Sequence, residues 1–165
     1  MKKLFTLLLF AGCLSIFSAA AKPKTVLVNY YFDYSKAKID KVSASTWFSR
    51  HYKDGGAAFK RRVARAMINA ANNESMRNKG FLLGNSTDTR YEVAIKFLIV
   101  DKDGAHKLQA VVYNKKTKKK VGSVDVRCRG GRGDNFESIF VEKVKRSGEE
   151  LGDKLVDDVL KDLYK

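Results

Sequence analysis

The chain has 165 residues, a net charge of +15 at pH 7 and 44% hydrophobic residues, which suits one folded domain with a basic surface and excludes a disordered polymer. Its two cysteines, Cys13 and Cys128, exclude a disulfide-rich scaffold. A charge surplus of this size favours anionic partners such as nucleic acid, lipid head groups or acidic polymers.

Residues 1–21 have the pattern of a signal peptide. Lys2 and Lys3 precede an apolar run over 4–17, and the small residues 18–21 suit cleavage before Lys22. The apolar run is too short to span a bilayer comfortably. We therefore predict an exported protein, periplasmic or secreted, whose mature chain 22–165 is a single α+β domain without a transmembrane helix.

The same segment has a second interpretation. Residues 10–13 (Phe-Ala-Gly-Cys) resemble a bacterial lipobox, in which the cysteine becomes lipidated. The alternative location is thus an outer-membrane lipoprotein anchored through Cys13. When the signal peptide is removed after residue 21, only Cys128 remains, so the mature chain can form no internal disulfide. The place of Cys128 at the end of an alternating strand predicts burial.

The first half of the mature chain predicts one strand followed by helices. Residues 25–32 are rich in β-branched and aromatic side chains and indicate a strand. A polar loop follows over 33–40, and 43–52 suits a short amphipathic helix or a packed loop. Apolar residues at helical spacing predict one long helix over 57–79, ended by Gly80.

The second half predicts a sheet and a final helix. A short strand over 81–83 precedes three long antiparallel strands over 90–100, 106–113 and 120–127, with a hairpin turn at 101–104. Asp134 and Glu137 form a capping-box pattern for a helix over 135–163. Gly148 and Gly152 in that helix predict a close approach of its backbone to the sheet.

These elements predict an α+β fold with the order β-α-β-β-β-β-α. We expect a mainly antiparallel sheet of four or five strands, with two long helices on one face.

No catalytic motif emerges from the sequence. The glycine-rich loop 130–133 lacks the Lys-Ser/Thr of a phosphate-binding loop, which favours a structural turn. His51 and His106 are isolated and are predicted at the surface, without metal-ligand spacing. We expect no enzyme, no cofactor and no metal. The remaining catalytic alternative is a cysteine hydrolase that uses Cys128 with a distant histidine.

The strongest candidate contact surface is a lysine-rich hairpin loop. Each lysine near an anionic membrane contributes about 1 kcal/mol. The alternative is an exposed hairpin whose charges discourage edge-to-edge aggregation. The candidate residues are Lys115, Lys116, Lys118, Lys119 and Lys120.

Several short motifs spread over the mature chain carry a resemblance. They are 32–35 (Phe-Asp-Tyr-Ser) with Ile39-Asp40, Lys79-Gly80-Phe81, Asp103-Gly104, 130–133 (Gly-Gly-Arg-Gly) and 147–155. In these motifs the chain resembles uncharacterised small exported or lipid-anchored proteins of Gram-negative envelopes. This group is similar in layout to the α/β domains of envelope assembly factors and lipoprotein activators. The resemblance implies a binding or scaffolding role, with an envelope protein or an anionic envelope surface as partner. The alternative is a nucleic-acid-binding basic module, which is less favoured because nucleic acid is scarce in the envelope.

Overall fold

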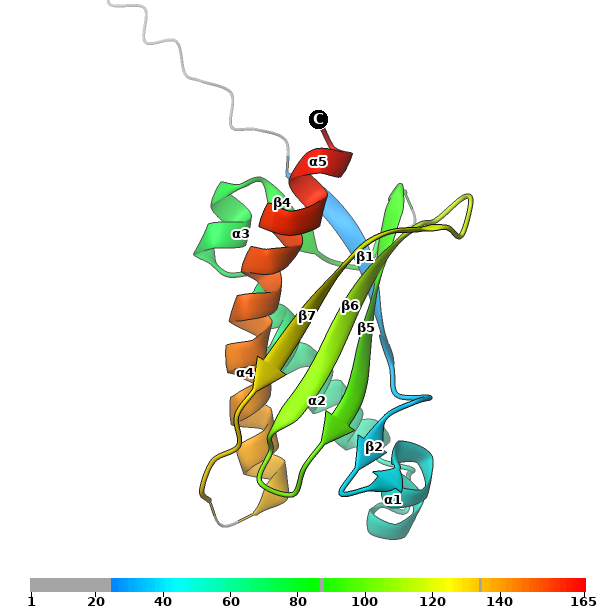
Figure 1. Cartoon of the computed structure of the whole chain (residues 1–165), viewed down its shortest axis with the longest axis vertical. Coiled ribbons are helices and arrows are strands. Elements are labelled where there is room, and N and C mark those ends of the chain that lie inside the picture. The colour runs from blue at the N-terminus through cyan, green and yellow to red at the C-terminus, as the bar shows by residue number, and fades with distance from the viewer. Residues whose placement is uncertain (1–24, 87, 134) are drawn as a thin grey trace, which may run out of the picture.

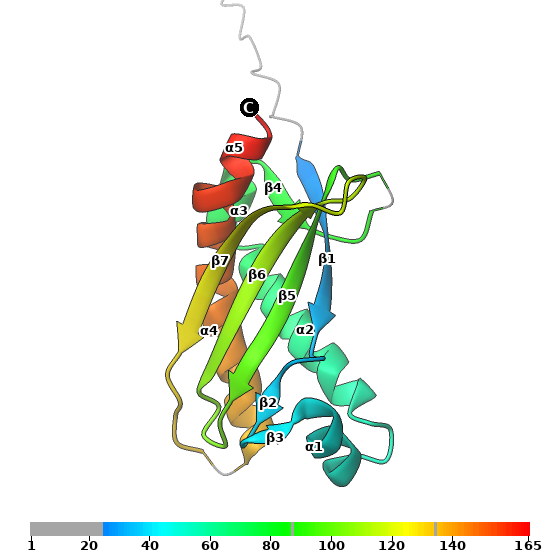
Figure 2. The ribbon, with the colours of Figure 1, turned by 45° about the vertical axis from the view of Figure 1, so that its right-hand side comes forward.

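The computed structural model describes residues 25–86, 88–133 and 135–165. The predicted signal peptide, Cys13 and Asp134 lie outside them. The α+β class is confirmed: helices α2 and α4 lie side by side against one face of a twisted sheet (Figures 1 and 2). The strands are β1 (Val26–Asp33), β2 (Lys38–Ile39), β3 (Val42–Ser43), β4 (Phe81–Leu83), β5 (Tyr91–Val100), β6 (His106–Asn114) and β7 (Lys120–Cys128). The helical segments are α1 (Ala44–His51), α2 (Ala57–Ala71), α3 (Glu74–Asn78), α4 (Phe136–Leu155), the π-helical η1 (Val156–Leu160) and α5 (Lys161–Leu163).

The sheet is a mixed, seven-stranded one, so the prediction of a mainly antiparallel sheet with four or five strands was wrong. β5, β6 and β7 form the predicted antiparallel meander. β6 pairs along the whole of β5, so β1 and β2 share the other edge of β5, and both run parallel to it. β1 is also parallel to β4, because the chain crosses back through the helices between them.

The segment predicted as a polar loop forms the small hairpin of β2 and β3. Asp40 and Lys41 both have positive φ, 46° and 67°, as a two-residue hairpin of the primed type requires. Ser43 then caps α1, since its hydroxyl accepts the backbone N–H of Thr46 at 3.3 Å. The residues 43–52 are thus mostly a helix, one of the two predicted options.

The helix predicted over 57–79 is interrupted at Asn72 and Asn73, which separate α2 from α3. The Asn72 side chain accepts the backbone N–H of Leu83 at 2.7 Å and donates to the Leu83 carbonyl at 2.8 Å. Asn73 caps the next helix, accepting the N–H of Met76 at 2.9 Å. Two asparagine side chains that bond to backbone groups compete with the helical ladder, which explains the break.

The last helix starts at Phe136 with Asn135 as its N-cap, whose side chain accepts the Ser138 N–H at 2.9 Å. The predicted capping box of Asp134 and Glu137 is wrong, because the N-cap is Asn135 and Glu137 bonds to Tyr52 and Arg62. One face of this helix and of η1 is buried throughout: Phe140, Val144, Gly148, Leu151, Leu155 and Val159. No helix within the described ranges is both long and apolar enough to cross a bilayer.

Gly148 and Gly152 allow a close approach, but to α2 and not to the sheet as predicted. A Cβ built on Gly148 would lie 2.4 Å from the Met67 carbonyl oxygen. One on Gly152 would lie 2.2 Å from that of Ala71. The two long helices therefore touch backbone to backbone.

Candidate anion-binding site

The β6–β7 hairpin has a loop whose conformation is held by its own backbone and by Asn114. The Asn114 N–H donates to the Lys119 carbonyl at 2.9 Å, and the Lys118 N–H donates to the Asn114 carbonyl at 2.8 Å. The Asn114 side-chain oxygen accepts from the N–H groups of Lys116 at 3.1 Å and Thr117 at 3.0 Å. Lys118 takes a positive φ of 56°. Because the loop closes through backbone groups and Asn114, it holds the lysine positions at the tip of the hairpin.

The five predicted lysines do not occupy equivalent positions. Lys115 and Lys116 line a pocket of about 430 Å³ beside the hairpin loop. Lys118, Lys119 and Lys120 are exposed and lie outside its lining. Two of the five lysines therefore line the pocket, and the other three are exposed on the hairpin outside it.

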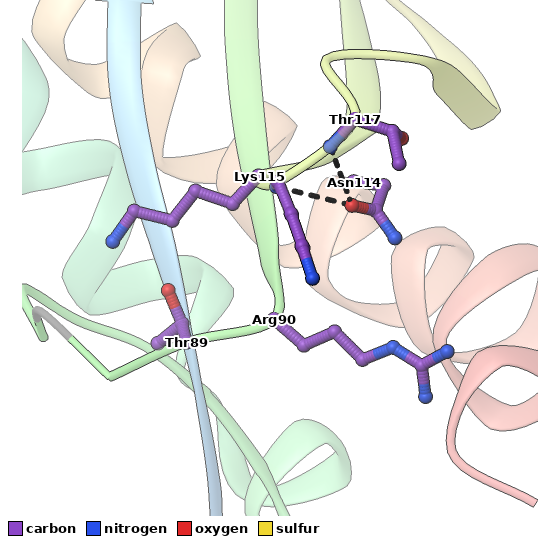
Figure 3. A pocket seen from close by; sticks show the side chains of 6 residues that line it. Thr89, Arg90, Asn114, Lys115 and Thr117 are labelled. Carbon is purple, nitrogen blue, oxygen red and sulfur yellow. Dashed lines mark hydrogen bonds between the residues drawn. The ribbon is translucent and has the colours of Figure 1, made fainter.

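The pocket lies between the hairpin and the start of β5, and we call it the basic pocket (Figure 3). It is lined by Thr89, Arg90, Asn114, Lys115, Lys116 and Thr117. The Lys115 N–H donates to the Arg90 carbonyl at 3.0 Å, which joins the hairpin to the preceding strand. Three of the six lining residues are cationic, and none of the six is acidic.

A buried hydroxyl adds to this pocket. Thr89 Oγ1 is buried and has no hydrogen-bond partner among the described residues. None of the ion pairs within the described ranges joins Lys116, Lys118, Lys119 or Lys120 to a carboxylate. The charges of these four lysines are therefore not paired with acidic side chains of the described residues, and an external anion would meet them directly.

Sequence reasoning missed Thr89 and Arg90. Arg90 was assigned to the start of a strand, with no indication that it lies beside the hairpin. The pairing register places Tyr91 opposite Asn114, so the residue before the strand faces the residue that opens the loop. A correct register of β5 and β6 is the signal that would have found both residues.

The residues of the catalytic alternative lie elsewhere. The prediction of His106 at the surface was wrong, since it is 4% exposed, whereas His51 is exposed. The His106 ring nitrogens contact the Gly104 carbonyl at 2.9 Å and the Ser147 hydroxyl at 2.7 Å. A carbonyl oxygen only accepts, so Nδ1 carries the hydrogen and the Ser147 hydroxyl donates to Nε2. Burial lowers the pKa of His106, which favours this neutral ring.

Cys128 lies opposite His106 in the β6–β7 pairing, yet its thiol contacts backbone carbonyl oxygens, those of Arg129 and Lys143. It is half-buried, and its Sγ lies 3.6 Å from the Lys143 carbonyl oxygen. Among the described residues, no group of three His, Cys, Asp or Glu side chains is placed to hold a metal. The clearest grouping of functional side chains among the described residues is therefore that of Arg90, Lys115 and Lys116 in the basic pocket.

Comparison with known proteins gives remote structural similarities. No family model matches the chain, and no curated protein matches it. Protein XCC0632 of Xanthomonas campestris, from the DUF330 family, is 12% identical, with 79% of this chain and 83% of that chain covered and a TM-score of 0.44. PelC of Paraburkholderia phytofirmans, solved as a dodecamer, is 10% identical, with 77% and 89% covered and a TM-score of 0.42.

Proposed function

We propose that this protein is a non-enzymatic envelope module that docks on an anionic surface through its hairpin end. The observation that carries the proposal is the basic pocket, where Arg90, which precedes β5, joins Lys115 and Lys116 from the hairpin loop. One anionic group of the surface, such as a lipid phosphate, would enter the pocket. Lys118, Lys119 and Lys120 would add longer-range attraction, about 1 kcal/mol for each lysine near the surface.

The position of the N-terminal end supports the same orientation. Thr25, the first described residue, lines a hollow together with Thr89 and Arg90. The start of β1 and the hairpin also lie at the same end of the molecule in both views (Figures 1 and 2). In the lipoprotein form, an anchor on Cys13 would therefore join the fold at the hairpin end. In the cleaved form, the same end would bind by charge alone.

The test compares charge reversal at the hairpin with charge reversal elsewhere. The purified protein is mixed with phosphatidylglycerol–phosphatidylcholine vesicles and with pure phosphatidylcholine vesicles, at low and high salt. We expect binding to the anionic vesicles only, weakened by salt. The double variant K116E/K118E should bind at least about thirtyfold more weakly at low salt, since two lysines contribute about 2 kcal/mol.

The matched control is R65E/K145E, which changes the net charge equally at exposed positions of α2 and α4. It should lose far less affinity than K116E/K118E. Equal losses would mean that only total charge matters, and would contradict a docking role for the hairpin. A duplex DNA arm at the same salt concentrations tests the nucleic-acid alternative, which tighter and steeply salt-dependent DNA binding would support.

A further inference from the structure

Helix α1 and the start of α4 lie at the end of the molecule opposite the β6–β7 loop (Figures 1 and 2). A second pocket is lined by residues from these two elements. Its volume is about 390 Å³. We call it the aromatic pocket, and it is lined by Trp47, His51, Tyr52, Asn135, Phe136 and Glu137. The sequence separates its two halves widely, so only the fold brings them together.

Aromatic rings form the walls of this pocket and are held by contacts that reach the core. The rings of Trp47 and Phe136 lie 5.0 Å apart between centroids. Phe136 stacks on Phe140 at 5.4 Å, and Tyr52 stacks on Phe59 at 5.7 Å. Because Phe59 and Phe140 are buried, the walls are anchored before any ligand arrives.

Among the described residues that line the pocket, Glu137 has the one carboxylate, and its charge is already compensated. The Tyr52 hydroxyl donates to Glu137 at 2.6 Å, and the Arg62 guanidinium pairs with the other carboxylate oxygen. The hydrogen bond from Tyr52, together with that from Arg62, lowers the pKa of Glu137. A cationic ligand would therefore find the Glu137 charge already paired with Arg62, and an anionic ligand would be repelled by Glu137. The charges favour an uncharged ligand.

Hydrogen-bonding groups remain available around the aromatic walls. Among the described residues, the Trp47 indole N–H has no hydrogen-bond partner, and the Asn135 oxygen caps α4, which leaves the amide hydrogens of Asn135 for a ligand. His51 Nδ1 donates to the Trp47 carbonyl at 2.8 Å, so Nε2 of the neutral ring is an acceptor. The pocket thus combines donors and acceptors with apolar ring surfaces.

We infer that the aromatic pocket binds neutral saccharide units. A pyranose ring presents an apolar C–H face, which packs against aromatic rings, and a rim of hydroxyls that both donate and accept hydrogen bonds. It carries no charge, and a pocket of this volume accommodates one or two such rings. This site is separate from the basic pocket and does not depend on binding to an anionic surface.

The test uses the only tryptophan of the chain, Trp47, as a reporter inside the pocket. The full protein is titrated with cellohexaose, maltohexaose and N-acetylchitohexaose while its tryptophan emission is recorded. We expect at least one of these sugars to give a saturable change in emission, together with protection of Trp47 from acrylamide quenching. No saturable change with any of them up to millimolar concentrations would overturn the inference.

Variants assign the signal to the pocket. F136L keeps most of the side-chain volume but removes an aromatic wall, and H51A removes the exposed ring that stacks on Trp47 at 4.2 Å. Each should weaken sugar binding at least tenfold, while K116E/K118E at the opposite end should bind sugar like the parent protein. Full binding by folded F136L and H51A, or binding of a proline-rich peptide in place of the sugars, would overturn the assignment.

Discussion

The contact between α2 and α4 depends on two positions without a side chain, and this can be tested by adding one methyl group at each. Gly148→Ala would place a Cβ 2.4 Å from the Met67 carbonyl oxygen, and Gly152→Ala would place one 2.2 Å from that of Ala71. Real Cβ atoms essentially never approach a heavy atom closer than 3.0 Å. Because the obstacle is backbone, no side chain can rotate away, and the two helices must separate.

Two opposing terms decide the size of the effect. Alanine in place of glycine in a helix gains about 1 kcal/mol of helix propensity. Overpacking of a well-packed core costs about 1–3 kcal/mol, and more where backbone must move. Buried side chains of the two helices, including Val63 of α2 and Val144 of α4, would lose packing as the helices separate. Because the obstacle is backbone, the cost of overpacking lies at the upper end of that range, about 3 kcal/mol. We therefore expect a net destabilisation of about 2 kcal/mol for each variant, which lowers Tm by roughly 4–8 °C.

The assay is urea unfolding followed by circular dichroism, with thermal melting as a second measurement. Glu149→Ala is the matched control, since it adds no atoms, lies between the two glycines and is exposed. It should change stability by less than about 0.5 kcal/mol. Variants G148A and G152A that are as stable as the parent protein, or more stable, would refute the argument that these glycines are required for backbone contact.

Three further predictions follow from the hydrogen bonds. Burial lowers the pKa of His106, so the stability that the neutral buried ring provides is complete above about pH 6.5 and is lost as the pH falls below that value. His106→Gln should therefore flatten the acidic part of a plot of urea midpoint against pH. An unchanged plot would contradict this prediction. Asn72→Ala removes both bonds to Leu83 and should cost about 1–3 kcal/mol, with faster hydrogen exchange at the Leu83 amide as the specific sign. Asn114→Ala removes the side-chain acceptor that orders the hairpin loop. It should weaken binding to anionic vesicles, while Tm changes by only a few degrees. Undiminished binding would show that an ordered loop is not needed for binding.

The sequence by itself determined the local elements of this protein. Alternating apolar residues identified the three long strands, and Asp103-Gly104 identified the turn between the first two, where Gly104 has a φ of 79°. Gly80 ended the helical region with a φ of 78°, as predicted. The lysines of the hairpin loop were recognisable for the same reason, because neighbours in the chain form that loop. Such signals depend on interactions within a few residues and are therefore readable from the sequence.

Partners distant in the chain were decided only by the tertiary structure. The alternating pattern of β5 states which side chains are buried, but the pattern is the same whether β1 pairs with it parallel or antiparallel. The glycine spacing in α4 predicted a close approach without naming α2 as the partner, and Asn72 broke the long helix because Leu83 lay within reach.

The candidate sites follow the same division. Lys115 and Lys116 were predicted, but Arg90 joined them only through the register of β5 and β6. Trp47 and Phe136 met only when α1 packed against the start of α4. A sequence pattern specifies on which face of its own helix or strand a side chain lies, whereas a binding pocket depends on which helices and strands pack together. That choice is made by the packing of the whole core, in which no single pair of residues determines the outcome.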